Sequence, residues 1–310
     1  MVDKRLFLPA PWVQDAERCR AAGVPQAEIR AQSTAELGLA MLAPARAAGH
    51  LQGQWVAGDD AYGMVPRLRD ALDEAHWRYV LDVPQTTPVF TQPSAVAVPP
   101  WSGRGPKPTV PRLAPDAAPA QSVAQVAAAL AAPAWREVTV AEGAQGPRPY
   151  AFVARRVWES RDGPPGRACW LLLRRNLDGS EPRYYLSNAP EDTPLQTLAQ
   201  VAAARWTIET EFETAKGEVG LDEYEVRSWP GWHHHITLAL LANAFLLTAQ
   251  QAWGEKAAPD HAAPDQSRAA RPLAPAHLDP GRSLALVDHH PRAQRAGQAL
   301  PYQTASAPAA

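Results

Sequence analysis

The chain has 310 residues, of which 46% are apolar and 20% are charged, close to the averages of globular proteins. This length and composition exclude wholesale disorder and allow one large domain or two ordinary ones. The net charge of −2 excludes a strong overall attraction to nucleic acid, and the two cysteines exclude a disulfide framework or a four-cysteine zinc site. Because the N-terminus lacks an apolar leader and the longest apolar run is too short for a bilayer, we expect a cytoplasmic protein without membrane contact.

The 32 prolines are about twice the usual share of about 5% and gather in two stretches. Ten lie between Pro84 and Pro119, and eight follow Gly254. Proline removes a backbone donor and fixes φ, so neither stretch is expected to hold long regular structure. The first stretch predicts a surface insertion or linker, and the second predicts a disordered tail over residues 254–310.

The N-terminal region reads as mixed α/β structure. Ser33 and Glu36 form a capping-box signature at the start of a helix that Pro44 should kink or end. Residues 54–57 and 78–83 predict two strands with a helix between them, and a strand–helix–strand unit of this length predicts parallel strands. Asp59 then lies at the carboxyl end of a strand, where open α/β sheets keep their ligand sites.

The region 85–190 reads as a proline-rich and β-rich insertion. It combines a short helix over 120–130 with strands over 136–140, 150–158, 169–174 and 183–186. Residues 85–183 carry twelve Lys and Arg against seven Asp and Glu, which indicates a modest basic surface. The pairs Arg155-Arg156 and Arg174-Arg175 on these strands are either a solvated face or phosphate contacts.

Two helices are predicted next. Thr193 and Pro194 suit the N-cap and first position of a helix that runs to about residue 219. A second helix over 232–253 is apolar nearly all round and is therefore expected to be buried. The adjacent histidines at 233–235 point in different directions on such a helix, which does not favour a zinc site.

Four charged residues share one face of the first of these helices: Arg205, Glu209, Glu213 and Lys216. One interpretation is a solvated stripe with ion pairs between successive turns. The other is a carboxylate ligand for a divalent metal, flanked by cations for phosphate. An Asp at a strand end and a Glu on a late helix suit a two-metal phosphoryl-transfer site, but the pattern alone leaves both interpretations open.

Longer motifs carry a family resemblance. The stretch Arg205-Trp206-x-Ile208-Glu209-x-x-Phe212-Glu213-x-x-Lys216-Gly217, continued to Trp232-His233, resembles the C-terminal catalytic block of DDE-type insertion-sequence transposases, most closely family 701. Gly58-Asp59-x-x-Tyr62-Gly63 resembles the block around that family's second catalytic Asp, and residues 6–9 and 21–25 match the stretch just upstream. The similarity spans about residues 1–253 and is weakest in the insertion.

This resemblance implies an RNase H-like α/β fold in which two Asp and one Glu hold two Mg²⁺ ions, which Mn²⁺ can replace. The implied activity is cleavage of double-stranded DNA at the terminal repeats of the element and strand transfer into target DNA. Asp59 would be the second Asp and Glu209 the third carboxylate, both catalytic metal ligands, while Arg205 and Lys216 would contact DNA phosphate. Ala202 stands where the wider signature has a Tyr.

The family's first catalytic Asp precedes the segment matched by residues 1–9, and Asp3 aligns with a non-catalytic position. The resemblance therefore implies an N-terminally truncated chain that lacks the first Asp and the opening strands of the sheet. We expect four parts: 1–84 with the second Asp, the insertion 85–190, 191–253 with the Glu helix and a buried helix, and a disordered tail over 254–310 whose sequence suggests a frameshift. The function is then that of a transposase fragment whose activity is in question, or alternatively of a catalytically dead DNA-binding remnant. A homodimer is left open.

Overall fold

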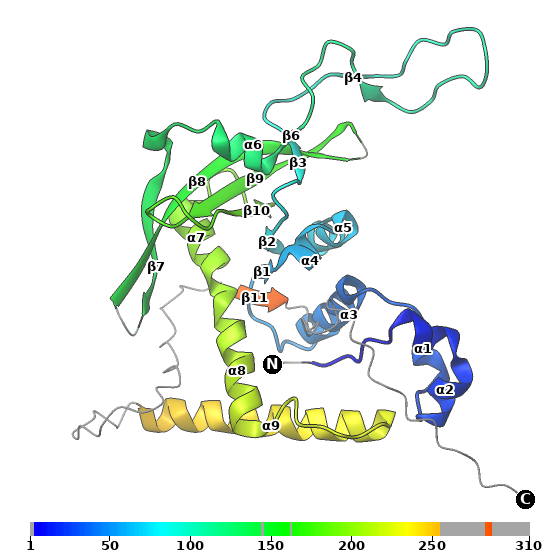
Figure 1. Ribbon diagram of the computed structural model, residues 1–310, viewed down its shortest axis with the longest axis vertical. Helices are drawn as coiled ribbons and strands as arrows, with labels where there is room; N and C mark the ends of the chain where they lie inside the picture. The colour runs from blue at the N-terminus through cyan, green and yellow to red at the C-terminus, as the bar shows by residue number, and fades with distance from the viewer. Residues whose placement is uncertain (1–2, 144–145, 162, 255–282, 287–310) are drawn as a thin grey trace, which may run out of the picture.

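The computed structural model describes residues 3–143, 146–161, 163–254 and 283–286 (Figure 1). It is mixed α/β, as the sequence predicts, and is built on one large sheet. The helices are α1 (Ala10–Gln14), α2 (Ala16–Ala21), α3 (Thr34–Ala47), α4 (Asp60–Gly63), α5 (Pro66–Glu74), α6 (Val123–Ala128), α7 (Leu195–Ala204), α8 (Trp206–Val219) and α9 (Trp229–Gly254), with short 3-10 turns η1 (Gln26–Glu28) and η2 (Ala132–Ala134). The strands are β1 (Trp55–Gly58), β2 (Arg78–Asp82), β3 (Pro88–Phe90), β4 (Val96–Ala97), β5 (Arg112–Leu113), β6 (Gln121–Ser122), β7 (Arg136–Gly143), β8 (Gly146–Ser160), β9 (Pro165–Arg175), β10 (Arg183–Ser187) and β11 (Ser283–Leu286).

The strand order in the large sheet is β11-β1-β2-β10-β9-β8-β3-β6, and β7 pairs with β8. The predicted parallel pairing of β1 with β2 is confirmed, whereas β10 joins β2 in the antiparallel sense. The strands of the region 85–190 therefore continue the sheet that β1 and β2 begin. Within the proline-rich stretch, β4 and β5 form only a two-residue pairing that projects from the rest of the chain (Figure 1).

Helices cover both faces of the sheet. On one face, α7 packs its buried Leu198 against Phe152, Leu172 and Tyr185 of β8, β9 and β10. On the other face, α3 and α5 cover β1 and β2, and α6 covers β8 and β9. The sheet is thus the middle of three layers, and its rows of residues alternate between the two apolar interfaces.

Three features of the helices differ from the sequence prediction. The capping box at Ser33 is present, but Pro44 does not end α3, which continues for three more residues to Ala47. Pro194, one residue later than predicted, is the N-cap of α7. The single predicted helix is interrupted at Arg205, where the Thr207 hydroxyl donates to the Ala204 carbonyl at 2.7 Å and competes with the helical hydrogen bonds.

The prediction that the last helix is buried is wrong. Leu238, Leu241 and Phe245 on α9 are 54%, 62% and 68% exposed. The reason is tertiary: α9 crosses the end of α8 that lies away from the sheet, so only the side that carries Ile236 and Ala239 is covered (Figure 1). None of the helices in the described ranges combines the length and apolar character needed to span a bilayer.

The disordered-tail prediction falls mostly on residues 255–282 and 287–310, which lie outside the described part of the chain. It does not hold for Ser283–Leu286, which form β11 parallel to β1, with Trp55 opposite Ser283 and Gly58 opposite Leu286. Without this strand β1 would be a sheet edge, and the unpaired backbone groups of an edge accept an added strand.

Candidate active site at the carboxyl edge of the sheet

Asp59 lies where the sequence places it, directly after the last residue of β1. Its side chain caps α4, because Oδ1 accepts a hydrogen bond from the backbone N–H of Ala61 at 3.1 Å. Asp59 is half-buried, whereas its neighbour Asp60 in the first turn of α4 is exposed. The strand and the helix cap together fix the Asp59 carboxylate at the carboxyl edge of the sheet.

The spacing of Gly58-Asp59-x-x-Tyr62-Gly63 follows from the packing of α4. Tyr62 is buried in the core beneath α3 and α5. Gly63 lies so close to the end of β2 that a Cβ on it would be 1.8 Å from the carbonyl oxygen of Asp82. The motif therefore combines a capping carboxylate, a buried aromatic anchor and a residue without a side chain, which allows α4 to contact β2.

A second carboxylate, which the sequence did not single out, ends β2, the strand next to β1. The parallel register pairs Gly58 with Leu81, so Asp59, which follows β1, and Asp82, the last residue of β2, each come one residue after this pair. Asp82 is 7% exposed, and burial raises its pKa to about 6, while Arg183 and Arg205 act to lower the pKa and Asp60 acts to raise it. The sequence position of Asp82 could have identified it, because Asp82 ends an apolar strand just as Asp59 follows one.

Arg205 brings a positive charge to this edge and forms an ion pair with Glu209. Arg205 stands at the junction of α7 and α8, and its Nη1 donates to Oε1 of Glu209 in the first turn of α8. Burial lowers the pKa of Arg205, but the hydrogen bond and charge of Glu209, with Asp82 and Tyr185, raise it above its ordinary value. Glu209 is thereby linked to the Asp82 edge through the guanidinium group of Arg205.

Lys216 is more distant from this edge. It lies in the last turn of α8, seven residues beyond Glu209, which corresponds to about 10 Å along the helix axis. Its Nζ is 3.8 Å from Oδ2 of Asp222. Of the four site residues predicted from the sequence, the structure places Asp59 at the sheet edge, joins Arg205 and Glu209 in one ion pair and leaves Lys216 at the other end of α8.

A buried network of ion pairs holds Gly63, the last residue of the Asp59 motif. Arg69 of α5 is 4% exposed and Glu159 of β8 is 3% exposed, and the two form a bidentate pair at 3.2 Å. Nη1 of Arg69 also donates to the carbonyl of Gly63, and Arg161 bonds both Glu159 and Asp70. The last residue of the motif is therefore tied to the strands of the region 85–190.

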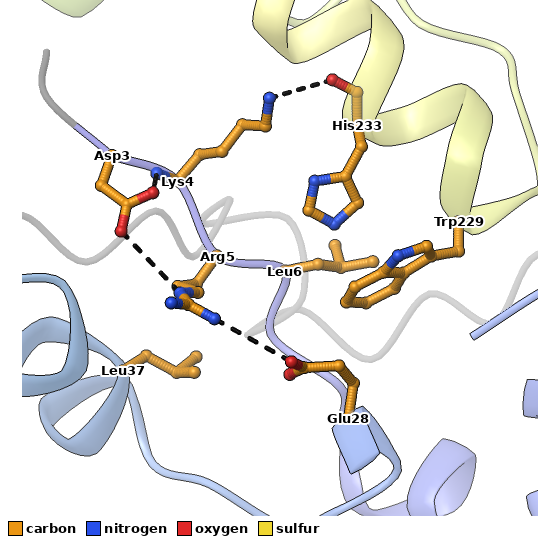
Figure 2. A pocket seen from close by; sticks show the side chains of 8 residues that line it. All are labelled: Asp3, Lys4, Arg5, Leu6, Glu28, Leu37, Trp229 and His233. Atoms are coloured by element: carbon orange, nitrogen blue, oxygen red, sulfur yellow. Dashed lines mark hydrogen bonds and ion pairs between the residues drawn. The ribbon is translucent and has the colours of Figure 1, made fainter. Parts of the chain in front are cut away.

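A pocket of about 230 Å³ lies elsewhere, between the N-terminal segment and the start of α9 (Figure 2). There Asp3 is 3.9 Å from Nε of Arg5, which also reaches Glu28 at 3.9 Å. His233 packs its ring 4.4 Å from that of Trp229. None of the residues that line this pocket belongs to the carboxylate edge, so the pocket is separate from the candidate active site.

The described part of the chain brings together no group of three or more His, Cys, Asp or Glu residues that could hold a metal ion. Asp59 and Glu209 offer the oxygen ligands that divalent cations prefer. They do not by themselves provide the carboxylate set of a two-metal centre.

Comparison with known proteins identifies the first half of the chain. Residues 1–147, which include Asp59 and Asp82, match the family model described as DDE superfamily endonuclease. This match supports a DDE-type transposase. The predicted relation to DDE-type transposases and the RNase H-like α/β fold are confirmed at that level. The DDE match implies a DNA substrate, and enzymes of the superfamily generally use divalent metals. The match ends before Arg205, Glu209 and Lys216, and no curated protein matches the chain.

Proposed function

We propose that the chain is related to the insertion-sequence transposases of family 701 and binds double-stranded DNA at the ends of its element. The observation that carries the proposal is the convergence on Asp82. Asp60, Arg183 and Arg205 come from three segments far apart in the sequence, yet each alters the pKa of this one carboxyl group. The DDE match covers only one of these segments, so the convergence connects it to the Glu209 helix.

In this proposal Asp59 and Glu209 are the metal ligands, with Mg²⁺ as the expected ion and Mn²⁺ as a substitute, and Arg205 holds a DNA phosphate. The position of Lys216, about two turns along α8 from Glu209, suits a phosphate more remote from the cleaved bond. Because the described residues do not complete a carboxylate triad, we derive no catalytic step through the ions. The same finding favours a second candidate function, a DNA-binding protein without cleavage activity.

The two candidates separate when duplex binding, Mn²⁺ binding and nicking are measured on the same preparation. Duplex binding is followed by the anisotropy of a fluorescent duplex, Mn²⁺ binding by calorimetry, and nicking on supercoiled plasmid in Mg²⁺ or Mn²⁺. We expect the chain to bind duplex DNA without nicking the plasmid, since a two-metal centre needs more carboxylates than Asp59 and Glu209 supply.

The variants Asp59→Ala and Asp60→Ala form a matched pair, because Asp60 is adjacent and exposed. Nicking that Asp59→Ala abolishes and Asp60→Ala preserves would establish the active transposase and exclude the inactive binding protein. A chain that binds neither duplex DNA nor Mn²⁺ would refute both.

A further inference from the structure

Three arginines lie in one row across four neighbouring strands of the sheet. Arg183 of β10 is opposite Arg174 of β9, Arg174 is opposite Phe152 of β8, and Phe152 is opposite Arg136 of β7. Residues directly opposite one another in a sheet point to the same face. Since Phe152 packs in the cluster that α7 covers, the three arginines occupy the α7 face at its margin.

In the described part of the chain, the arginines of this row have no acidic partner, whereas several other arginines do. Arg136 and Arg183 are exposed, and the guanidinium of the half-buried Arg174 stacks 4.2 Å from the ring centre of Tyr150. Within the described ranges none of the three has a carboxylate within ion-pair distance, whereas Arg69 and Arg161 are fully paired. Like charges on neighbouring strands destabilise a sheet, so an anionic partner would offset this repulsion.

The row begins at the candidate active site. Tyr185, two residues after Arg183, is opposite Asp82, and Arg183 is one of the cations that lower the pKa of Asp82. Arg205 is another. From there the row runs away from Asp59 and Asp82 along the same edge of the sheet, toward β7. The acidic Asp178 in the β9–β10 turn is already engaged, because it accepts hydrogen bonds from Ser180.

We propose that Arg183, Arg174 and Arg136 form a phosphate track that holds the DNA duplex flanking the candidate active site. This inference rests on the proposed function and extends it to a surface outside the catalytic motifs. Four strands at about 4.8 Å spacing span about 14 Å, which is the rise of about four base pairs. The planar, permanently charged guanidinium group suits phosphate oxygens in two-pronged contacts.

The aromatic side chains of this surface favour a duplex over a single strand. Proteins that bind single strands stack bases on accessible aromatic rings. Here the Tyr150 ring is occupied by Arg174, and Phe152 is fully buried. The track therefore offers charge to a phosphate backbone without offering a stacking platform to bases.

The test compares two triple variants of equal charge change. Arg136, Arg174 and Arg183 are replaced by Gln in the first, and Arg20, Arg30 and Arg155 in the second. The control arginines are exposed and without ion pairs in the described part of the chain, and Arg155 projects from the opposite face of β8, since it pairs with Leu171 of the other core. The dissociation constant for a fluorescent duplex is measured over a range of salt concentrations, together with thermal unfolding.

We expect the track variant to bind the duplex more weakly. Its affinity should also depend less steeply on salt: the magnitude of the slope of log affinity against log salt should fall by about 2.7, or about 0.9 for each phosphate that the variant no longer neutralises. The control variant keeps the wild-type slope. Equal slopes in both variants, or a weakening confined to single-stranded oligonucleotides, overturn the track while leaving the proposed function intact. If the wild-type chain binds no duplex, the proposed function itself fails. Should the triple variant unfold, the exposed edge variant Arg136→Gln repeats the test with an expected slope change of about 0.9.

Discussion

Replacing Gly63 by alanine should destabilise the protein far more than an added methyl group usually does. The new Cβ would lie 1.8 Å from the Asp82 carbonyl oxygen and 2.9 Å from the carbonyl carbon of the same residue. Because carbon–oxygen contacts normally begin at about 3.3 Å, α4 and β2 would have to separate by about 1.5 Å. Neither partner is a flexible side chain, so both backbones must shift.

The cost of this shift can be bounded. Overpacking a core by extra methylene groups typically costs about 1–3 kcal/mol, and values above about 4 kcal/mol mark backbone or network disruption. The carbonyl of Gly63 also accepts from the buried Arg69, so displacement of α4 weakens that contact too. We therefore expect Gly63→Ala to lower the free energy of unfolding by about 3–5 kcal/mol.

Gly217→Ala is the matched control. Gly217 lies within α8, and nothing approaches its Cβ position within 4 Å. Alanine there should raise the free energy of unfolding by about 0.5–1 kcal/mol, because glycine is the less favourable residue in a helix. Urea unfolding followed by tryptophan fluorescence and circular dichroism measures both variants. A Gly63→Ala protein as stable as wild type would show that α4 does not contact β2 in this way. It would also refute the close-packing role of Gly63 in the motif.

Three further outcomes are expected. The folded-state pKa of Asp82 is raised from 3.8 to about 6, so its contribution to stability is fully present below the lower value and is lost as the pH rises through about 6. In the wild-type protein the free energy of unfolding should therefore fall between pH 4 and 7, and Asp82→Asn should reduce this fall by at most about 3 kcal/mol. An unchanged pH profile would contradict the raised pKa of Asp82. Glu159→Ala leaves the buried guanidinium of Arg69 without its charge partner and should lower the free energy of unfolding in urea by about 3–5 kcal/mol. The control Glu191→Ala removes the 81% exposed partner of Arg156 and should cost less than about 1 kcal/mol. Similar costs for the two variants would argue against a buried pair. Truncation after Gly254 removes β11 and should lower the melting temperature and promote aggregation through the uncovered β1 edge, and an unchanged melting temperature would show that β11 adds nothing to the sheet.

Local features of this protein were determined by its sequence. The Ser33–Glu36 capping box, the parallel pairing of β1 with β2 and the position of Asp59 after β1 each depend on residues close together in the chain. Short-range periodicity and side-chain chemistry are sufficient for such features, because the partners that form them are neighbours in sequence. The ion pair of Arg205 with Glu209 is of the same kind, since four residues separate the two on a helix.

Only the tertiary structure decided which groups share the sheet edge and which apolar surfaces are covered. Asp82 became part of the candidate site because Arg183 and Arg205, more than a hundred residues away, face the same buried position. The helix α9 remained half exposed although its sequence is apolar all round, because its surroundings cover only one of its sides. Burial and long-range register depend on how distant segments pack, and no local pattern of residue types encodes that packing.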